Sequence, residues 1–343
     1  MSKANLCYNI SMSTKENKID FLAIGDIVID VFIKLKQAEI VGTPDTPNYK
    51  ICLSFGEKVP YEDVFVIPAV GNASNAVISA ARLGLKTALV SNLGNDRDGE
   101  DCISTLKKNN VKTDFVKVHS GLKTNYHYVL WYGAERTILI KHQDYPYALP
   151  DIGDPKWIYF SSVNETAFPF HLKIADYLDT HPDTKLAFQP GKFEIKLGKE
   201  KLERIYKHSK IFFCNVEEAN KILGSNILDV KELLKNMRQA GPEIVVITDG
   251  PKGAYAYDGE DVYFIESFPD PKPPYSRTGA GDAFSSTVAS AIILGKTLPE
   301  ALAWGGVNSM AVVQQVGANV GLLAREKLEE YLQNAPDYKA RKI

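Results

Sequence analysis

The chain has 343 residues, of which 45% are hydrophobic and 24% are charged, a composition typical of a soluble globular protein. Lysine and arginine number 40 against 42 aspartates and glutamates, so the net charge of −2 gives no reason to expect a nucleic acid or a membrane surface as partner. No apolar run approaches the roughly 20 residues that span a bilayer, no apolar secretory signal opens the chain, and the 4 cysteines form no CxxC pair. We therefore expect a cytoplasmic protein with free thiols.

The first third of the chain predicts two kinds of β structure. A polar, flexible leader is expected over 1–18 and is followed by a β-rich run over 19–32, a buried first strand with Asp30 at its end. The segment 50–68 alternates apolar and polar residues and carries Gly and Pro, which favours a half-exposed antiparallel excursion. A turn and helix over 71–84 come next, with Gly84 as the stop signal.

The rest of the chain indicates an α/β domain. A hairpin is predicted over 124–142, which with 50–68 could form a small second sheet. Strands and helices then alternate up to 250, a pattern that implies a parallel sheet covered on both faces. A meander over 253–267 and two long helices over 281–295 and 299–317 follow, and a solvated tail is expected at 336–343.

The short stretch TGAGD, at 278–282, carries the clearest chemical signal. A glycine-rich turn that opens a helix directs backbone N–H groups and the positive end of the helix dipole toward one point, which suits a phosphoryl group. Asp282 can take a proton beside that point. The alternative is a tight turn with an aspartate as helix cap, and no GK[ST] follows as in a Walker P-loop.

Four segments together resemble the ribokinase-like (PfkB) family of carbohydrate kinases: TGAGDAF, FFCNVEEANKILG, VVITDGPKGAYAY and GNASNAVISAARLG. Their order and spacing match the family over roughly residues 20–335. The resemblance implies a three-layer α/β/α core with a mostly parallel sheet over 19–335, and a small β-sheet lid built from about 33–68 and 124–142. It also implies ATP and Mg²⁺ as cosubstrates and transfer of the γ-phosphoryl group to a primary hydroxyl of a sugar or sugar derivative.

The resemblance assigns roles to individual residues. Asp282 resembles the catalytic base, and Gly279, Ala280 and Gly281 resemble the anion hole. Asn215 and Glu218 match an NxxE pattern that positions Mg²⁺ and phosphate through water; a helix start with a capping Asn is the alternative. Residues expected on the acceptor side are Asp30, Gly71, Asn75, Gln189 and Arg136, the last of which could equally be an exposed hairpin arginine. Residues expected at the nucleotide are Asn215, Thr248, Gly250, Gly253 and Asn308, although a buried helical Asn308 is as plausible as one that lines the adenine pocket.

Departures from the family pattern leave the acceptor open. Val28 and Val70 replace residues typical of ribokinases, and Ser276 replaces an aspartate associated with a monovalent-cation site. A nucleoside kinase is the main alternative, because Tyr126, Tyr128, Trp131 and Tyr132 in the lid could stack on a base. A non-catalytic nucleotide-binding regulator and a Rossmann-type oxidoreductase are less favoured, since Asp282, Asn215 and Glu218 are intact and no GxGxxG follows the first strand. Family members often pair into a homodimer through the lid.

Overall fold

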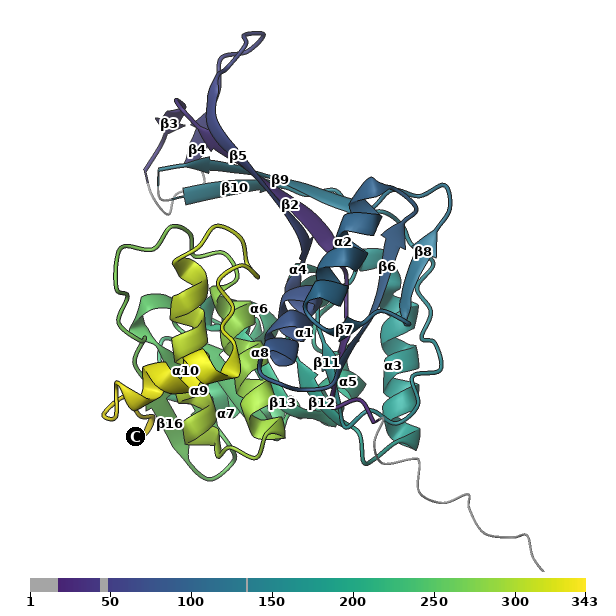
Figure 1. The fold of residues 1–343 in the computed structure, drawn as a ribbon. Helices are drawn as coiled ribbons and strands as arrows, with labels where there is room; N and C mark the ends of the chain where they lie inside the picture. Colours follow the sequence, from purple (N-terminus) through teal and green to yellow (C-terminus); the bar gives the residue numbers. More distant parts are fainter. Residues whose placement is uncertain (1–17, 44–48, 134) are drawn as a thin grey trace, which may run out of the picture.

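A large, mostly parallel sheet forms the centre of the protein (Figure 1). The computed structural model describes residues 18–43, 49–133 and 135–343, so the expected leader lies almost wholly outside the described residues. Strand order in this sheet is β17-β16-β15-β14-β13-β12-β11-β1-β6-β7, with β8 also paired to β6. Every pair from β14 to β7 is parallel, and the three pairs beyond β14 are antiparallel. The strands are β1 (Phe21–Ile24), β6 (Thr87–Gly94), β7 (Val111–Lys112), β8 (Val116–His119), β11 (Trp157–Phe160), β12 (Lys185–Phe188), β13 (Ser209–Asn215), β14 (Ile244–Thr248), β15 (Ala254–Tyr257), β16 (Val262–Ile265) and β17 (Arg341–Lys342).

Helices cover both faces of this sheet, which confirms the predicted three-layer α/β/α fold. One buried cluster joins the sheet to α1, α2, α8, α9 and α10, and a second cluster on the other face joins it to α3, α5, α6 and α7. Both clusters are built from strand residues buried on both sides, as expected of parallel strands between helical layers. The helices are α1 (Asn72–Arg82), α2 (Arg97–Lys108), α3 (Phe168–Thr180), α4 (Lys192–Leu197), α5 (Glu203–His208), α6 (Val216–Leu223), α7 (Val230–Gln239), α8 (Ala280–Ile293), α9 (Leu298–Val313) and α10 (Arg325–Gln333), with 3-10 turns at Glu165–Ala167 and Gly250–Lys252.

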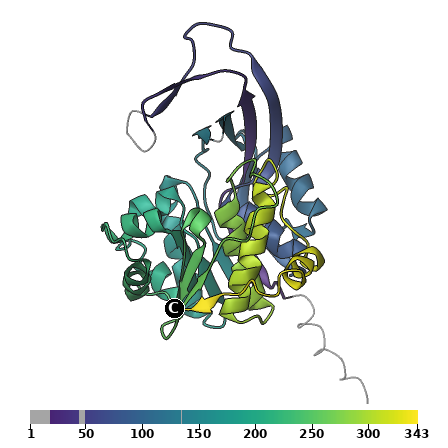
Figure 2. The same ribbon diagram turned by 90° about the vertical axis from the view of Figure 1, so that its left-hand side faces the viewer.

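A second, four-stranded sheet stands away from the core in both views (Figures 1 and 2). Its order is β10-β9-β2-β5, and β3 and β4 form a separate two-stranded ribbon beside it. This arrangement confirms the small second sheet expected from the alternating segment and the hairpin, with β2 parallel to β9 and the two outer pairs antiparallel. We call the four-stranded sheet the lid sheet. Its strands are β2 (Val28–Leu35), β5 (Tyr61–Val70), β9 (Asn125–Tyr132) and β10 (Glu135–Leu139), and the ribbon is β3 (Glu39–Val41) with β4 (Lys50–Cys52).

The β-rich run at 19–32 is two strands and not one, which corrects the predicted first strand. β1 ends at Ile24 in the main sheet, and β2 begins at Val28 in the lid sheet. The chain turns at Gly25, where a Cβ would lie 2.7 Å from the Cβ of Ala73. Asp30 therefore lies inside the first lid strand rather than at the end of a core strand.

The end of the chain is largely exposed, as its polar composition predicts, but it is also attached to the core. β17 pairs antiparallel with β16, and the Tyr338 hydroxyl donates a hydrogen bond of 2.8 Å to the Glu266 carbonyl oxygen. The Tyr338 ring packs edge-on against Phe268 at 4.9 Å. In the part of the chain that the structure describes, no helix is long and apolar enough to cross a membrane.

Replacing Tyr338 should measurably destabilise the protein. Tyr338→Ala removes the ring contact and the hydrogen bond, and we expect the free energy of unfolding to fall by about 2 kcal/mol. Urea unfolding followed by circular dichroism measures the change. Lys339→Ala, at an exposed neighbouring position, is the control and should stay within about 0.5 kcal/mol of the wild type. Equal stability of both variants would show that the end of the chain is not held as described.

Candidate active site

Asp282 lies in the first turn of α8, where three side-chain amides hold its carboxylate. Asn72 and Gln189 donate to Oδ1, each at 3.0 Å, and Asn75 donates to Oδ2 at 2.8 Å. Asn72 and Asn75 share one face of α1 because they are three residues apart, and Gln189 follows β12. The structure thus brings together three predicted site residues, Asp282, Asn75 and Gln189, and adds Asn72.

Two opposing influences act on the Asp282 carboxyl. Burial raises its pKa most strongly, and the negative charge of Asp30 raises it further, whereas the three amide donors lower it. The net pKa lies above the ordinary value of an aspartate. The raised pKa makes the ionised carboxylate a stronger proton acceptor than an aspartate in water, and the amide donors favour that ionised form.

The turn before Asp282 has the geometry of an anion-binding helix start. Gly279 is the N-cap of α8 with φ of 82°, and a Cβ there would lie 2.5 Å from the Cβ of Ala318, so only glycine fits. A Cβ at Gly281 would meet nothing within 4 Å, which leaves open space beside the first turn. The backbone N–H groups of a first helical turn lack intrahelical partners and face this space.

A cavity of about 760 Å³ adjoins this turn. The volume is in the range of small-molecule sites. Ala280 and Gly281 line one side, and predicted nucleotide residues line the other: Asn215, Thr248, Gly250 and Gly253. Gly253 has φ of 114°, and a Cβ there would lie 2.0 Å from the Ile265 carbonyl oxygen. Any larger residue at this position would therefore collide with β16.

Asn308 does not line this cavity, which corrects its predicted place in the adenine pocket. It is fully buried, and its amide donates to Thr287 at 2.8 Å and accepts from the Leu323 backbone N–H at 2.9 Å. The next two residues of α9, Ser309 and Met310, line the cavity instead. Asn308 thus ties α9 to α8 and serves the packing of helices.

Asn215 and Glu218 form a reciprocal capping box at the start of α6. The Asn215 side chain accepts from the Glu218 N–H at 2.8 Å, and the Glu218 carboxylate accepts from the Asn215 N–H at 2.9 Å. Burial raises the pKa of Glu218, and the charge of Asp282 raises it further. The helix-start alternative is therefore realised, and the Glu218 carboxyl also lies close enough to Asp282 to feel its charge.

These groups fit a hydrated Mg²⁺. Two partly buried carboxylates that repel each other would be stabilised by a divalent cation between them and the phosphates. No cluster of three or more His, Cys, Asp or Glu suited to a metal occurs among the described residues. A few oxygen donors with several retained waters is the usual protein environment of Mg²⁺.

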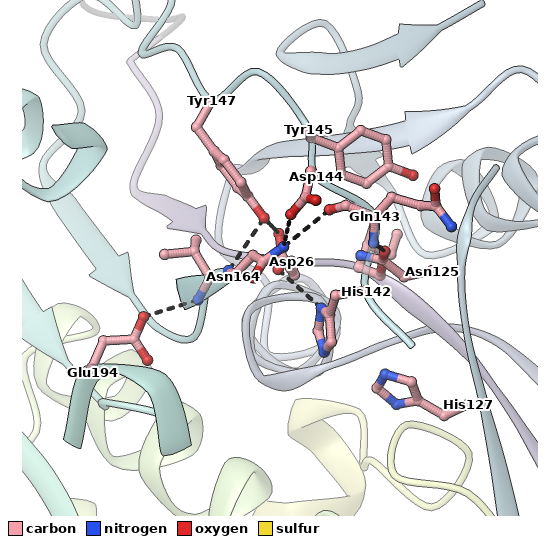
Figure 3. Close-up of polar contacts among 12 residues, drawn as sticks. Asp26, Asn125, His127, His142, Gln143, Asp144, Tyr145, Tyr147, Asn164 and Glu194 are labelled. Atoms are coloured by element: carbon pink, nitrogen blue, oxygen red, sulfur yellow. Dashed lines mark hydrogen bonds and ion pairs between the residues drawn. The ribbon is translucent and has the colours of Figure 1, made fainter. Parts of the chain in front are cut away.

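Two histidines near Asp30 and Asp26 each lie beside a carboxylate, and Figure 3 shows His142 next to Asp26 with His127 nearby. His127 Nδ1 lies 3.3 Å from Asp30 Oδ1, and His142 Nδ1 lies 3.4 Å from Asp26 Oδ2. The two imidazole rings are 5.1 Å apart. Asp30, expected to bind the acceptor, is thus buried and accompanied by an imidazole.

Gly71 connects the lid sheet to the core. It follows β5 and caps α1 with φ of 103°, and a Cβ there would lie 2.7 Å from the Asp26 carbonyl oxygen. Arg136 lies in β10 of the lid sheet and is partly buried rather than fully exposed. Both acceptor-side predictions therefore fall on the lid or its junction with the core.

The sequence reasoning missed Asn72, His127 and His142. Asn72 had a usable signal, because a helix that begins at 72 places it on the face of Asn75. The two histidines had none, since they meet only through the pairing of β2 with β9 and the return of the chain from the lid sheet.

Comparison with known proteins agrees with this geometry. The family model described as "pfkB family carbohydrate kinase" matches residues 39–325. The chain belongs to this family. Its members transfer a phosphoryl group to an alcohol, so the pfkB protein described here is a sugar or nucleoside kinase.

Individual relatives differ in the acceptor that their names state. The chain is 27% identical over 284 residues to a ribokinase of Bacillus subtilis, with 81% of this chain and 92% of the relative covered. It is 23% identical over 263 residues to a nucleoside kinase of Methanothermobacter thermautotrophicus, with 74% and 80% covered. The fold matches an Arabidopsis thaliana ribokinase complexed with ribose and ATP at a TM-score of 0.76 and 17% identity, covering 92% of this chain and 99% of that one. These likenesses establish the fold and the family but not the acceptor.

Proposed function

We propose that this pfkB protein transfers the γ-phosphoryl group of ATP to a primary hydroxyl of a sugar or sugar derivative, with Asp282 as general base. The observation that carries the proposal is the place of Asp282. Its carboxylate lies beside the cavity-lining turn at Ala280 and Gly281 on one side and within the electrostatic reach of Asp30 on the other. A base between a phosphate site and a hydroxyl site is what in-line transfer requires.

The chemical step follows from these positions. The acceptor hydroxyl gives its proton to Asp282 while its oxygen forms a bond to the γ-phosphorus, and the bond between that phosphorus and the β,γ-bridging oxygen breaks to release ADP. Asn72, Asn75 and Gln189 keep the carboxylate aimed and ionised before it receives the proton. The N–H groups at Gly279, Ala280 and Gly281 stabilise negative charge on the transferring group.

The residues at the nucleotide would bind ATP and a hydrated Mg²⁺. Thr248, Gly250, Gly253 and Asn215 line the cavity that would hold the nucleotide, and Glu218, which is hydrogen-bonded to Asn215, would hold waters of the ion together with it. Bound there, Mg²⁺ would neutralise phosphate charge next to two carboxylates. Closure of the lid sheet around Gly71 would exclude water that would otherwise hydrolyse ATP.

The strand register favours a sugar over a nucleoside as acceptor. Asp30 pairs with His127, so alternate residues of β9 share the face of Asp30, and Tyr126, Tyr128 and Tyr132 point to the opposite face. Trp131 alone of the four lid aromatics shares the face of Asp30, where it packs near Lys34 and Phe65. A nucleoside base would thus find little of the aromatic platform that composition suggested.

The outward face of the lid sheet supports a homodimer. Four exposed apolar residues share the face opposite Asp30 by strand register, namely Val64, Val66, Tyr128 and Leu139. A continuous apolar surface on one sheet face usually marks an interface. A second copy of the same chain would cover the patch symmetrically.

Removing the proposed base should strongly reduce kcat and leave nucleotide binding nearly unchanged. We expect Asp282→Asn to lower kcat by roughly 10²–10⁴-fold, the usual contribution of general-base catalysis. ADP release from Mg·ATP, measured over sugars, sugar phosphates and nucleosides, tests the loss, and calorimetric titration with ATP tests binding. Unchanged turnover in this variant would falsify the role of Asp282.

Removing one amide donor should shift the pH profile toward alkaline pH. Asn75→Ala deletes a hydrogen bond that favours the ionised form, so the pKa of Asp282 rises and the acid limb of kcat/KM moves to higher pH. Loss of one charged hydrogen bond corresponds to about one pH unit. The pH dependence of kcat/KM measures the shift, with Asn334→Ala at the exposed end of α10 as control. An acid limb of kcat/KM that stays at the wild-type pH, or moves to lower pH, would contradict the role of Asp282 as the base whose pKa this limb reports.

A charge on the outward lid face should separate the dimer. We expect the wild type to sediment as a dimer and Val66→Glu as a monomer, because burying an unpaired carboxylate is costly. Val118→Glu introduces the same change at a similarly exposed valine on β8 of the main sheet and should leave the dimer intact. A monomeric wild type, or a dimeric Val66→Glu, would exclude this interface.

A further inference from the structure

Arg136 lies on the inward face of the lid sheet, the face that carries Asp30. β10 pairs with β9 so that Arg136 is opposite Trp131, and β9 pairs with β2 so that His127 is opposite Asp30. Trp131 and His127 are four residues apart and therefore share a face. The strand between them measures about 13 Å at roughly 3.3 Å per residue. Arg136 thus marks the far end of the same surface on which Asp30 and His127 mark the near end.

The Arg136 guanidinium is half-buried and forms no ion pair with any residue that the structure describes. Burial lowers its pKa, whereas the charge of the neighbouring Glu135 and, less strongly, the charge of Asp30 raise it, so the guanidinium also feels the carboxylate at the other end of the inward face. Among the residues that the structure describes, it forms no ion pair within 4.0 Å. Lys34, on the same inward face, is different because it pairs with Glu62 at 2.5 Å. A partly desolvated cation is costly unless an anion approaches it.

A second unpartnered group lies at the near end of this surface. His127 Nε2 is buried and has no hydrogen-bond partner among the described residues, while its Nδ1 faces Asp30. A carboxylate beside Nδ1 favours the tautomer with the proton on Nδ1, which leaves Nε2 as an acceptor. A hydroxyl group of a ligand is the natural donor to such a nitrogen.

From these positions we propose that the acceptor is a polyhydroxy compound with an anionic group, a carboxylate or a phosphate ester, at the end opposite the primary hydroxyl that receives the phosphoryl group. Arg136 binds the anionic end, Asp30 and His127 bind hydroxyls in the middle, and Asp282 faces the reacting hydroxyl. The inference rests on the proposed function and adds the charge of its substrate. It also explains why Arg136, unlike Lys34, forms no ion pair among the described residues.

Matched acceptor pairs test this proposal. D-gluconate and D-glucose differ by a carboxylate, and D-fructose 6-phosphate and D-fructose differ by a phosphate, while each of the four carries a primary hydroxyl. Steady-state ADP release at saturating Mg·ATP gives kcat/KM for each, in the wild type, Arg136→Gln, Arg136→Lys and the control Lys34→Gln. Binding is measured in parallel as the shift in melting temperature that each compound produces.

We expect the wild type to prefer one anionic member over its neutral partner by roughly tenfold or more in kcat/KM, as a charged hydrogen-bonded pair provides. The pair that shows the preference tells carboxylate from phosphate. Arg136→Gln should bring the ratio close to one, mainly through KM, Arg136→Lys should restore part of it, and Lys34→Gln should leave it unchanged.

Two results would overturn the proposal without touching the proposed kinase function. One is turnover with equal kcat/KM for the charged and neutral members of both pairs, and the other is a preference that Arg136→Gln leaves intact. If none of the four compounds turns over, the melting temperatures decide: stabilisation by an anionic member that Arg136→Gln abolishes supports the proposal, and its absence overturns it. Failure of kinase activity itself is read separately, from the wider panel with Asp282→Asn.

Discussion

The site depends on one carboxylate held by three amides. Asn72 and Asn75 come from α1, which begins where the lid sheet joins the core, and Gln189 comes from the end of β12 in the main sheet. Asp282 itself opens α8, so a single hydrogen-bonded group fixes the relative positions of two helices and a strand end. Because the donors are neutral amides, they orient the carboxylate without neutralising it. Burial can then raise its pKa and make it a useful base.

The side chains of the lid sheet alternate between a face that looks toward Asp282 and an outward face. Residues of β2 and β9 at one parity, such as Asp30 and His127, face the site, and those at the other parity, such as Tyr128, face outward. A single-residue slip in this pairing would exchange the two sets and turn Asp30 and His127 to the outward face. The paired register of β2 with both β5 and β9 therefore determines which residues lie on the face of Asp30 and which lie on the outward face.

The sequence predicted the large elements of the fold well and failed at particular positions for physical reasons. The TGAGD turn and the alternation of strands and helices were readable because glycine conformation and hydrophobic periodicity are local. The break at Gly25 was hidden, since residues on both sides favour strands and only contact with Ala73 requires the turn. Asn308 was misplaced because α9 is buried all round, so periodicity cannot tell which face meets the cavity. β17 was invisible because an edge strand can pair through backbone groups alone, with side chains as polar as Arg341 and Lys342.

The turn next to Asp282 and the junction of the lid sheet share one supporting segment. Ala318 packs against Gly279 so closely that a Cβ at Gly279 would lie 2.5 Å away, and the neighbouring Asn319 donates to the Ala69 carbonyl oxygen at 2.9 Å. Ala69 has a positive φ of 56°, a costly conformation for a residue other than glycine. The amide of Asn319 compensates that cost by binding the carbonyl in place. Ala318 and Asn319 thus hold the N-terminus of α8 and the end of β5 in place. The two segments on either side of Asp282 are therefore positioned by the same short piece of chain.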